Sequence, residues 1–196
     1  MTEKEKIIQL AKKNNGLLLT KQVTEAGISR YALREVVAEG KLANIQRGIY
    51  VSEEGYVDEF FLLQQRFPKG VYSHETALYL LGFSDRAPQQ IVITFEQGQS
   101  TSRMKTENIR PVMISHHFYE GVIEIKRSGG TFVRVYCIER TLVDMMKTRY
   151  DGDLEQLIPA LKRYATYQSK DVNLLYRYAR LFNVEEQVRS YMGVLL

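Results

Sequence analysis

Basic side chains that could bind a polyanion gather near the start of the sequence. Residues 1–52 hold nine basic and five acidic side chains, whereas the other residues hold 18 of each. Arginine suits phosphate and guanine because its planar guanidinium donates paired N–H groups. The charge distribution therefore favours a polyanion-binding segment at the N-terminus. A well-solvated surface is the alternative that charge alone leaves open.

Arg30, Tyr31 and Arg34 lie in the first turns of a segment with helical periodicity, which Ser29 is suited to cap. The pattern of apolar residues leaves the three side chains free to point away from the core. A cation at a helix N-terminus costs about 0.3 to 1 kcal/mol because it opposes the helix macrodipole. Arg30 therefore indicates a role beyond folding, such as a contact with phosphate or with guanine.

Helix signals around these residues predict a helix-turn-helix. A capping box at Thr2–Glu5 begins one helix, and Thr20 caps a second, short helix that runs to Ala26. Gly27 suits the left-handed turn before the third helix, which runs to Glu39. In such a motif the last helix enters the major groove of DNA, so we expect its N-terminal residues to face the bases.

A β-hairpin after the third helix predicts a wing. Lys41–Gln46 and Ile49–Val51 have strand composition, and the turn between them lies at Arg47-Gly48. Arg47 at the tip would reach a phosphate or the minor groove, where the negative potential favours a guanidinium. The alternative is a helical domain whose hairpin docks another protein. The DNA-contacting residues expected from the whole pattern are Lys21, Ser29, Arg30, Tyr31, Arg34, Lys41 and Arg47.

The sequence predicts an α+β protein with a winged helix-turn-helix domain at 1–53 and a larger mixed domain at 54–196. In the larger domain we expect a connecting helix over 57–65, a helix capped by Ser73, and C-terminal helices from Ile138 onward. Strand composition predicts a mainly antiparallel sheet with a turn at 128–130. The expected strands are 91–95, 110–115, 122–126 and 131–136.

Histidines outside the N-terminal segment do not form a pattern with catalytic or metal-binding chemistry. His74 lies in the first turn of a predicted helix, and a lone histidine there favours a packed, hydrogen-bonded role. His116 and His117 are neighbours on an extended chain and point to opposite faces, so they do not predict a shared metal ion. We expect no catalytic residue, no metal site and no cofactor.

Two further pairs of charged residues have simple structural interpretations. Arg140 and Asp144 are four residues apart on a predicted helix, which indicates an intrahelical ion pair of about 0.2 to 0.5 kcal/mol. Asp151 and Asp153 are expected to cap the helix that starts near Leu154, because the other ligands of a calcium loop do not follow them.

Composition narrows the class of protein further. The chain is 44% apolar and 26% charged, as is typical of a soluble globular protein, and its one cysteine, Cys137, cannot form an intramolecular disulfide. No apolar run approaches the ~18 residues of a membrane span, and the charged start is unlike a signal peptide. We therefore expect a cytoplasmic protein without membrane contact. A Gly-rich phosphate loop and a nucleophile paired with its base are both missing from the sequence, which favours a protein that is not an enzyme.

Three segments resemble a known protein family. They are Gln46–Val51, which closes the basic start, Tyr72–Asp85, with its serine-histidine, alanine-leucine and glycine positions, and Ile138–Asp144. In their order and spacing they are similar to the AbiEi-type antitoxins of type IV toxin-antitoxin systems. The likeness extends over nearly all of the chain.

The resemblance implies an antitoxin of an abortive-infection, phage-defence system, encoded beside a nucleotidyltransferase-like toxin that its C-terminal domain antagonises. It also implies a repressor that binds inverted repeats in its own promoter through Arg30, Tyr31, Arg34 and Arg47. The toxin-antagonising residues stay unassigned, although the family likeness of the Arg140 segment leaves a toxin-facing role open. Two other functions stay open: a stand-alone winged-helix regulator whose C-terminal domain senses a ligand or joins subunits, and an enzyme guided to DNA by the winged helix.

Overall fold

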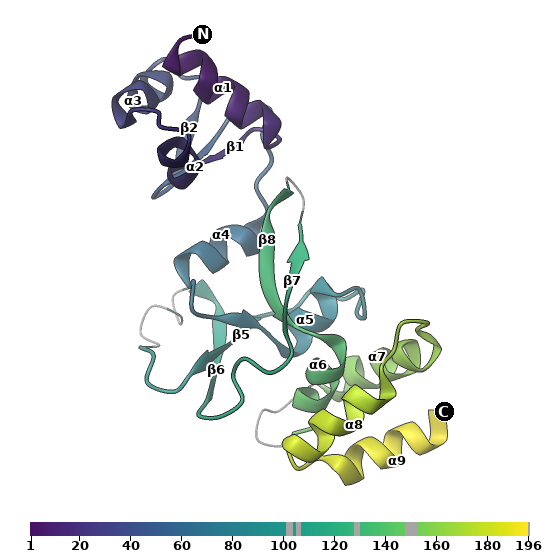
Figure 1. Cartoon of the computed structure of the whole chain (residues 1–196). Coiled ribbons are helices and arrows are strands. Elements are labelled where there is room, and N and C mark those ends of the chain that lie inside the picture. Colours follow the sequence, from purple (N-terminus) through teal and green to yellow (C-terminus); the bar gives the residue numbers. More distant parts are fainter. Residues whose placement is uncertain (101–103, 105–106, 128–129, 148–152, 196) are drawn as a thin grey trace. The chain divides into compact units, whose positions relative to one another are not determined.

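The chain divides into two compact units. The structure is a computed structural model that describes residues 1–195 apart from 101–103, 105–106, 128–129 and 148–152 (Figure 1). Unit 1 comprises Met1–Pro68 and Ile125–Val133, and unit 2 comprises Lys69–Glu124 and Arg134–Leu196. The predicted domain boundary between residues 53 and 54 falls inside unit 1. It stays a prediction, because compactness alone does not show which part folds independently.

Unit 1 begins with helices and a small antiparallel sheet in the order of a winged helix-turn-helix (Figure 1). Strand β3 lies between β1 and β2 and pairs antiparallel with both. The predicted hairpin is therefore confirmed, and β1 extends it into a sheet. The elements are α1 (Glu3–Lys13), β1 (Leu17–Leu19), α2 (Thr20–Glu25), α3 (Arg30–Ala38), β2 (Ala43–Gln46), β3 (Ile49–Val51) and α4 (Glu59–Arg66).

An apolar core and local caps hold α1, α2 and α3 in place. The predicted capping box is present, since Glu5 N donates to Thr2 Oγ1 and Thr2 N donates to Glu5 Oε2. Thr20 is the first residue of α2 rather than its cap, and Gln22 Oε1 accepts the hydrogen bond of Leu19 N instead. A side chain from within the first turn thus satisfies the helix start. The buried core residues are Ile7, Ala11, Leu18, Val23, Ile28, Ala32, Leu33, Val36 and Leu42.

A buried carboxylate explains why residues 125–133 group with unit 1. Asp58 is 3% exposed, and its Oδ1 accepts a hydrogen bond from Phe61 N at the start of α4. Its Oδ2 lies 2.9 Å from Arg127 Nη2, and the same guanidinium lies over the Phe60 ring, 5.4 Å from its centroid. Because a buried charge is tolerated only when it is paired and hydrogen-bonded, these contacts hold Arg127 against α4.

The remaining elements form a mixed sheet and the C-terminal helices, which confirms the predicted α+β class. The sheet has the strand order β6-β5-β4-β8-β7. Helices α5 to α9 share an apolar core that includes Leu78, Leu142, Leu157, Leu175 and Val188. The elements are β4 (Val71–Tyr72), α5 (His74–Leu80), β5 (Ile91–Glu96), β6 (Ile109–Ile114), β7 (Val122–Lys126), β8 (Phe132–Tyr136), α6 (Ile138–Met145), α7 (Leu154–Thr166), α8 (Val172–Leu181) and α9 (Glu185–Leu195).

The sheet is mixed rather than mainly antiparallel as predicted. Strands β5 and β6 are parallel, β4 and β8 are parallel, and β4 and β5 are antiparallel. Parallel neighbours need a long connection, which residues 97–108 supply between β5 and β6. Strand β4 is too short to show a pattern in the sequence. The predicted turn at 128–130 lies largely outside the described residues, and the predicted cap Asp151 lies wholly outside them.

Arg140 and Asp144 form the predicted ion pair, but both are buried in unit 2. The Arg140 side chain is 1% exposed, and its Nε donates to Asp144 Oδ2 over 2.7 Å. Its Nη1 donates to the carbonyl oxygens of His117 and Glu120. Two rings flank the guanidinium: Tyr136 at 4.3 Å and Phe182 at 3.9 Å. The energy expected of an exposed pair therefore does not apply here, because removing one partner of a buried pair leaves an uncompensated charge and costs about 3 to 5 kcal/mol. Burial also leaves neither residue accessible to a toxin.

Replacing Arg140 by leucine should lower the free energy of unfolding by about 3 to 5 kcal/mol, because the buried Asp144 carboxylate loses a partner. The double variant Arg140→Leu, Asp144→Leu should lose less than the single variant, since the buried carboxylate is removed together with its arginine partner and the ammonium of Lys147, which also pairs with Asp144, is the more exposed of the two cations. Urea denaturation followed by circular dichroism measures both effects. A single variant as stable as the wild type would contradict this account of the pair.

His74 is packed and hydrogen-bonded, which confirms the structural role expected of it. The residue is 1% exposed with φ at +50°, and its Nδ1 lies 3.0 Å from Ser73 Oγ. Ser73 stands at the cap position of α5, but its side chain makes no cap bond and accepts a hydrogen bond from Thr94 Oγ1 over 2.9 Å. Burial disfavours the imidazolium and lowers the pKa of His74 to about 4.

Buried, neutral His74 should make the protein less stable as the pH falls. The unfolded chain gains this proton near pH 6.5 and the folded chain only near pH 4, so the contribution is complete above pH 6.5 and is lost between these values. The variant His74→Asn removes the titrating group and keeps a residue type that tolerates positive φ. Denaturant melts across this pH window should show a smaller loss in the variant. Equal losses would show that His74 does not titrate as stated.

Candidate nucleic-acid interface

The start of helix α3 determines which of its faces is exposed. Gly27, with φ at +67°, turns the chain after α2, and Ile28 N donates to Val23 O across that turn. Ser29 Oγ then accepts a hydrogen bond from Ala32 N over 3.2 Å and caps α3, as predicted. The helix starts in a position that packs one of its faces into the core and leaves the other face exposed to solvent. The buried residues of α3 are Ala32, Leu33 and Val36.

Three arginines line one hollow of unit 1. Arg30, Tyr31 and Arg34 are all exposed on α3, and Tyr31 is 69% exposed. Arg30 and Arg34 lie one helical turn apart on the same side. Together with Arg47 from the hairpin turn they line a concave surface of about 480 Å³. The structure thus brings together side chains that the sequence places in two separate elements.

Gly48 ties the hairpin turn to the helix-turn-helix. Its carbonyl oxygen accepts a hydrogen bond from Thr20 N, at the start of α2, over 2.9 Å. Gly48 has φ at +79°, and a Cβ built there would lie 3.3 Å from Thr20 Oγ1. Glycine adopts this conformation without strain, so the turn can approach α2 closely and hold Arg47 at the hollow.

The three arginines of the hollow have no acidic partner in the part of the chain that the structure describes. The ion pairs at the surface of the first fifty residues involve lysines instead: Lys4 with Glu35 and Glu39, Lys21 with Glu25, and Lys41 with Glu39. Like charges gathered at one surface without counter-ions repel one another and oppose folding weakly. A cationic surface of this kind attracts an anionic partner, which would give the three arginines a role outside folding.

Two predicted contact residues, Lys21 and Lys41, are already paired in the free protein. Lys41 Nζ lies 2.7 Å from Glu39 Oε2, and Lys21 Nζ lies 3.7 Å from Glu25 Oε1. Hydrogen bonds from Lys4 and Lys41 lower the pKa of Glu39 to about 2. A role of these lysines in binding stays a prediction, and it requires that they exchange a carboxylate for a phosphate.

The hydroxyl group of Ser29 both donates and accepts a hydrogen bond within unit 1. Its Oγ donates to Glu3 Oε2 over 2.6 Å while it accepts the hydrogen bond of Ala32 N. Its backbone N also donates to Glu3 Oε1. These bonds link the start of α3 to α1, which gives Ser29 a structural role. Its contact with DNA stays a prediction.

Two residues that line the hollow were not predicted from the sequence as ligand contacts. Thr20 and Tyr50 line it together with the three arginines. Thr20 begins α2, and Tyr50 lies on β3, where it pairs with Leu18 of β1 and Asn44 of β2. Their positions depend on the pairing of the sheet with the helices. The sequence signal for Tyr50 was only its position in the predicted wing strand Ile49–Val51.

Asp153 and Cys137, which lie outside the hollow, have structural positions. Within the described ranges, no three His, Cys, Asp or Glu side chains come together to hold a metal ion. Asp153 caps α7 as predicted, since its Oδ1 accepts a hydrogen bond from Glu155 N. Burial raises the pKa of the Cys137 thiol to about 11, so the thiol is protonated at neutral pH. Each of the described helices is too short or too polar to cross a bilayer.

Comparison with known proteins gives a family match at the N-terminus and a similar fold. No curated protein is similar enough to count as a match. The crystal structure of the RV2827C protein from Mycobacterium tuberculosis is similar at 17% identity and a TM-score of 0.55, over 92% of this chain and 72% of that chain, and this likeness shows a shared fold. A family model described as "Transcriptional regulator, AbiEi antitoxin" matches residues 5–52. The family resemblance predicted from the sequence is thereby confirmed over residues 5–52.

Proposed function

We propose that this protein is an antitoxin that represses its own operon by binding promoter DNA through unit 1. The observation that carries the proposal is the hollow in which Arg30, Arg34 and Arg47 lie without acidic partners among the described residues. Double-stranded DNA is a dense polyanion, and arginine both neutralises phosphates and recognises guanine. The match of residues 5–52 to transcriptional regulators supports the same function.

In the proposed complex, α3 lies in the major groove. Its first turn presents Arg30 and Tyr31 to the base edges, and Arg34 follows one turn later. Arg47 at the tip of the hairpin binds a phosphate or enters the adjacent minor groove. Lys21, Ser29 and Lys41 border this surface as additional backbone contacts. Two copies of the protein would occupy an inverted repeat, because each half-site takes one recognition helix.

We propose that the rest of the chain antagonises a nucleotidyltransferase-like toxin, and that the protein acts as a regulator rather than as an enzyme. The antitoxin family matched at the N-terminus supports this division of roles. The buried state of Arg140 and Asp144 directs the search for toxin-antagonising residues to other positions, since both residues are at most 2% exposed.

Changing Arg30, Arg34 or Arg47 to alanine should weaken binding to DNA from upstream of the protein's own gene by about tenfold or more for each residue. Thermal melts should change little, because the three side chains are exposed and lack ion pairs within the described residues. Lys12→Ala is a matched control, since it removes an exposed cation of the same unit that does not line the hollow. Fluorescence anisotropy measures the affinities.

The salt dependence of binding shows whether a variant loses affinity because it lost a phosphate contact or because its fold is disturbed. The slope of log K against log salt should become shallower by about 0.9 for each phosphate contact that a variant removes. A wild-type affinity that does not change with salt would contradict the proposal. So would a Lys12→Ala variant that loses as much affinity as the arginine variants.

The full-length triple variant Arg30→Ala, Arg34→Ala, Arg47→Ala should still protect cells from the toxin, because the substituted side chains lie only in unit 1. Growth after induced expression of the neighbouring gene, with wild type or variant supplied from a second plasmid, measures protection. A reporter fused to the promoter measures repression in the same cells, and repression should be lost. Loss of protection at an unchanged protein level would show that the two activities are not separate.

A further inference from the structure

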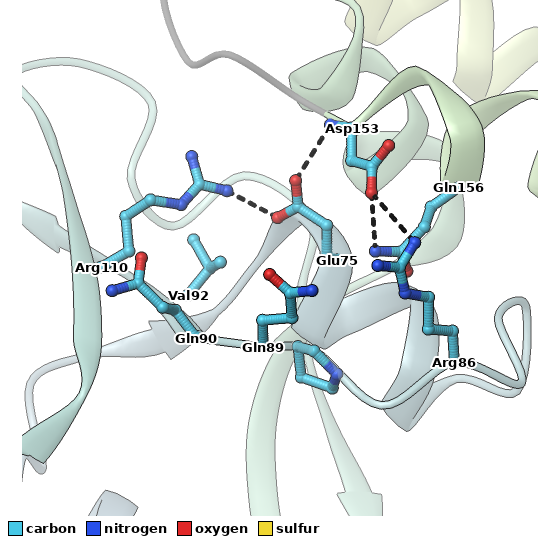
Figure 2. A pocket seen from close by; sticks show the side chains of 9 residues that line it. Glu75, Arg86, Gln89, Gln90, Val92, Arg110, Asp153 and Gln156 are labelled. Carbon is cyan, nitrogen blue, oxygen red and sulfur yellow. Dashed lines mark hydrogen bonds and ion pairs between the residues drawn. The ribbon is translucent and has the colours of Figure 1, made fainter.

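Unit 2 contains a polar pocket of about 290 Å³ that the proposed function does not use. Its walls come from α5, from the loop that precedes β5, from β6 and from the start of α7. Figure 2 shows guanidinium, carboxylate and amide groups of these segments facing the same space. The side chains that matter here are Glu75, Arg86, Gln89, Gln90, Arg110 and Asp153.

The carboxylates of the pocket are already satisfied by protein groups. Glu75 is 6% exposed, its Oε2 accepts a hydrogen bond from Arg110 Nη2 over 2.6 Å, and its Oε1 accepts one from Asp153 N. Asp153 accepts hydrogen bonds from Glu155 N and from Gln156 Nε2. Because these acceptors are occupied, the pocket does not favour a cationic ligand. Figure 2 shows this chain of contacts between Arg110 and α7.

Arg86 is the charged group of the pocket that is held most loosely. Its side chain is 50% exposed, and its Nη1 lies 3.6 Å from Glu155 Oε2 and 3.8 Å from Asp153 Oδ2. Both separations exceed the length of a charge-assisted hydrogen bond. The guanidinium therefore can still form close paired bonds with an oxyanion. The Glu155 side chain is 86% exposed, so it competes weakly for Arg86.

Two glutamines supply neutral hydrogen-bonding groups between the arginines. Gln89 and Gln90 are exposed, and Figure 2 shows them between Arg110 and Arg86. Gln90 Nε2 has one long contact, 3.4 Å to Asn108 Oδ1. Each amide has both donors and an acceptor, which suits a hydroxyl or an amide edge of a ligand better than a purely apolar one.

We infer that this pocket binds a small phosphorylated molecule of sugar or nucleoside size. Arg86 binds the phosphate, and the amides of Gln89 and Gln90 bind its neutral, hydrogen-bonding part. A phosphate has three terminal oxygens, so it can accept both donors of one guanidinium at once. The volume of 290 Å³ is near the lower end of small-molecule sites, about 300 Å³, which suits a ligand of this size. This inference does not rest on the proposed binding of DNA.

Isothermal titration calorimetry of the full-length protein tests the pocket with four probes: guanosine monophosphate, ribose 5-phosphate, inorganic phosphate and unphosphorylated guanosine. At least one of the two phosphorylated organic probes should bind more tightly than phosphate or guanosine. Which of the two binds more tightly distinguishes a nucleotide from a sugar phosphate. Arg86→Gln should weaken this binding by about tenfold or more.

The matched control is Arg177→Gln, because the Arg177 side chain is 62% exposed, forms an ion pair with Glu120 over 3.2 Å, and does not line the pocket. Its affinity for the probe should equal that of the wild type. Gln90→Ala should weaken binding of the organic probe and not that of inorganic phosphate. The inference is overturned if no probe binds, if Arg86→Gln leaves binding unchanged, or if inorganic phosphate binds as tightly as the organic phosphates.

Discussion

Three like charges share one surface of unit 1, and the rest of that unit must hold them there. Arg30 and Arg34 are fixed because α3 packs its other face into the apolar core, and Arg47 is fixed because Gly48 accepts a hydrogen bond from Thr20. Repulsion among guanidinium groups opposes this arrangement, and dissolved salt screens it only in part. The arrangement is favourable once an anion of matching shape occupies the hollow, so the same interaction that opposes folding promotes binding.

In unit 2, by contrast, several charged side chains are buried and paired. Arg140 is buried and donates to a carboxylate and two backbone carbonyls, and the buried Glu75 accepts from Arg110 and from the backbone. In both clusters, charges removed from water receive partners from several elements, which makes them part of the fold. Arg86 differs, since its nearest carboxylates lie beyond hydrogen-bond distance. The distinction between paired and loosely paired arginines thus separates structural cations from those available to a ligand.

Local signals in the sequence predicted unit 1 well because caps and turns depend on neighbouring residues. The cap at Ser29, the turn at Gly27 and the exposed face of α3 all follow from spacing along the chain. Features that depend on tertiary contacts were missed or misjudged: the parallel strand pairs, the burial of Arg140, and the places of Thr20 and Tyr50 in the hollow. Strand order and burial depend on which segments meet in space, and residue spacing does not encode that. The pocket of unit 2 was missed for the same reason, because its walls come from separate segments.

We propose that the cationic hollow of unit 1 lies against DNA. Nuclear magnetic resonance of the side-chain Nε–Hε groups of arginine during titration with a promoter duplex tests it most directly. If the hollow binds DNA, the signals of Arg30, Arg34 and Arg47 should shift and saturate together, while that of the buried Arg140 stays in place. Signals of the three arginines that stay unchanged while the protein binds the duplex would contradict it.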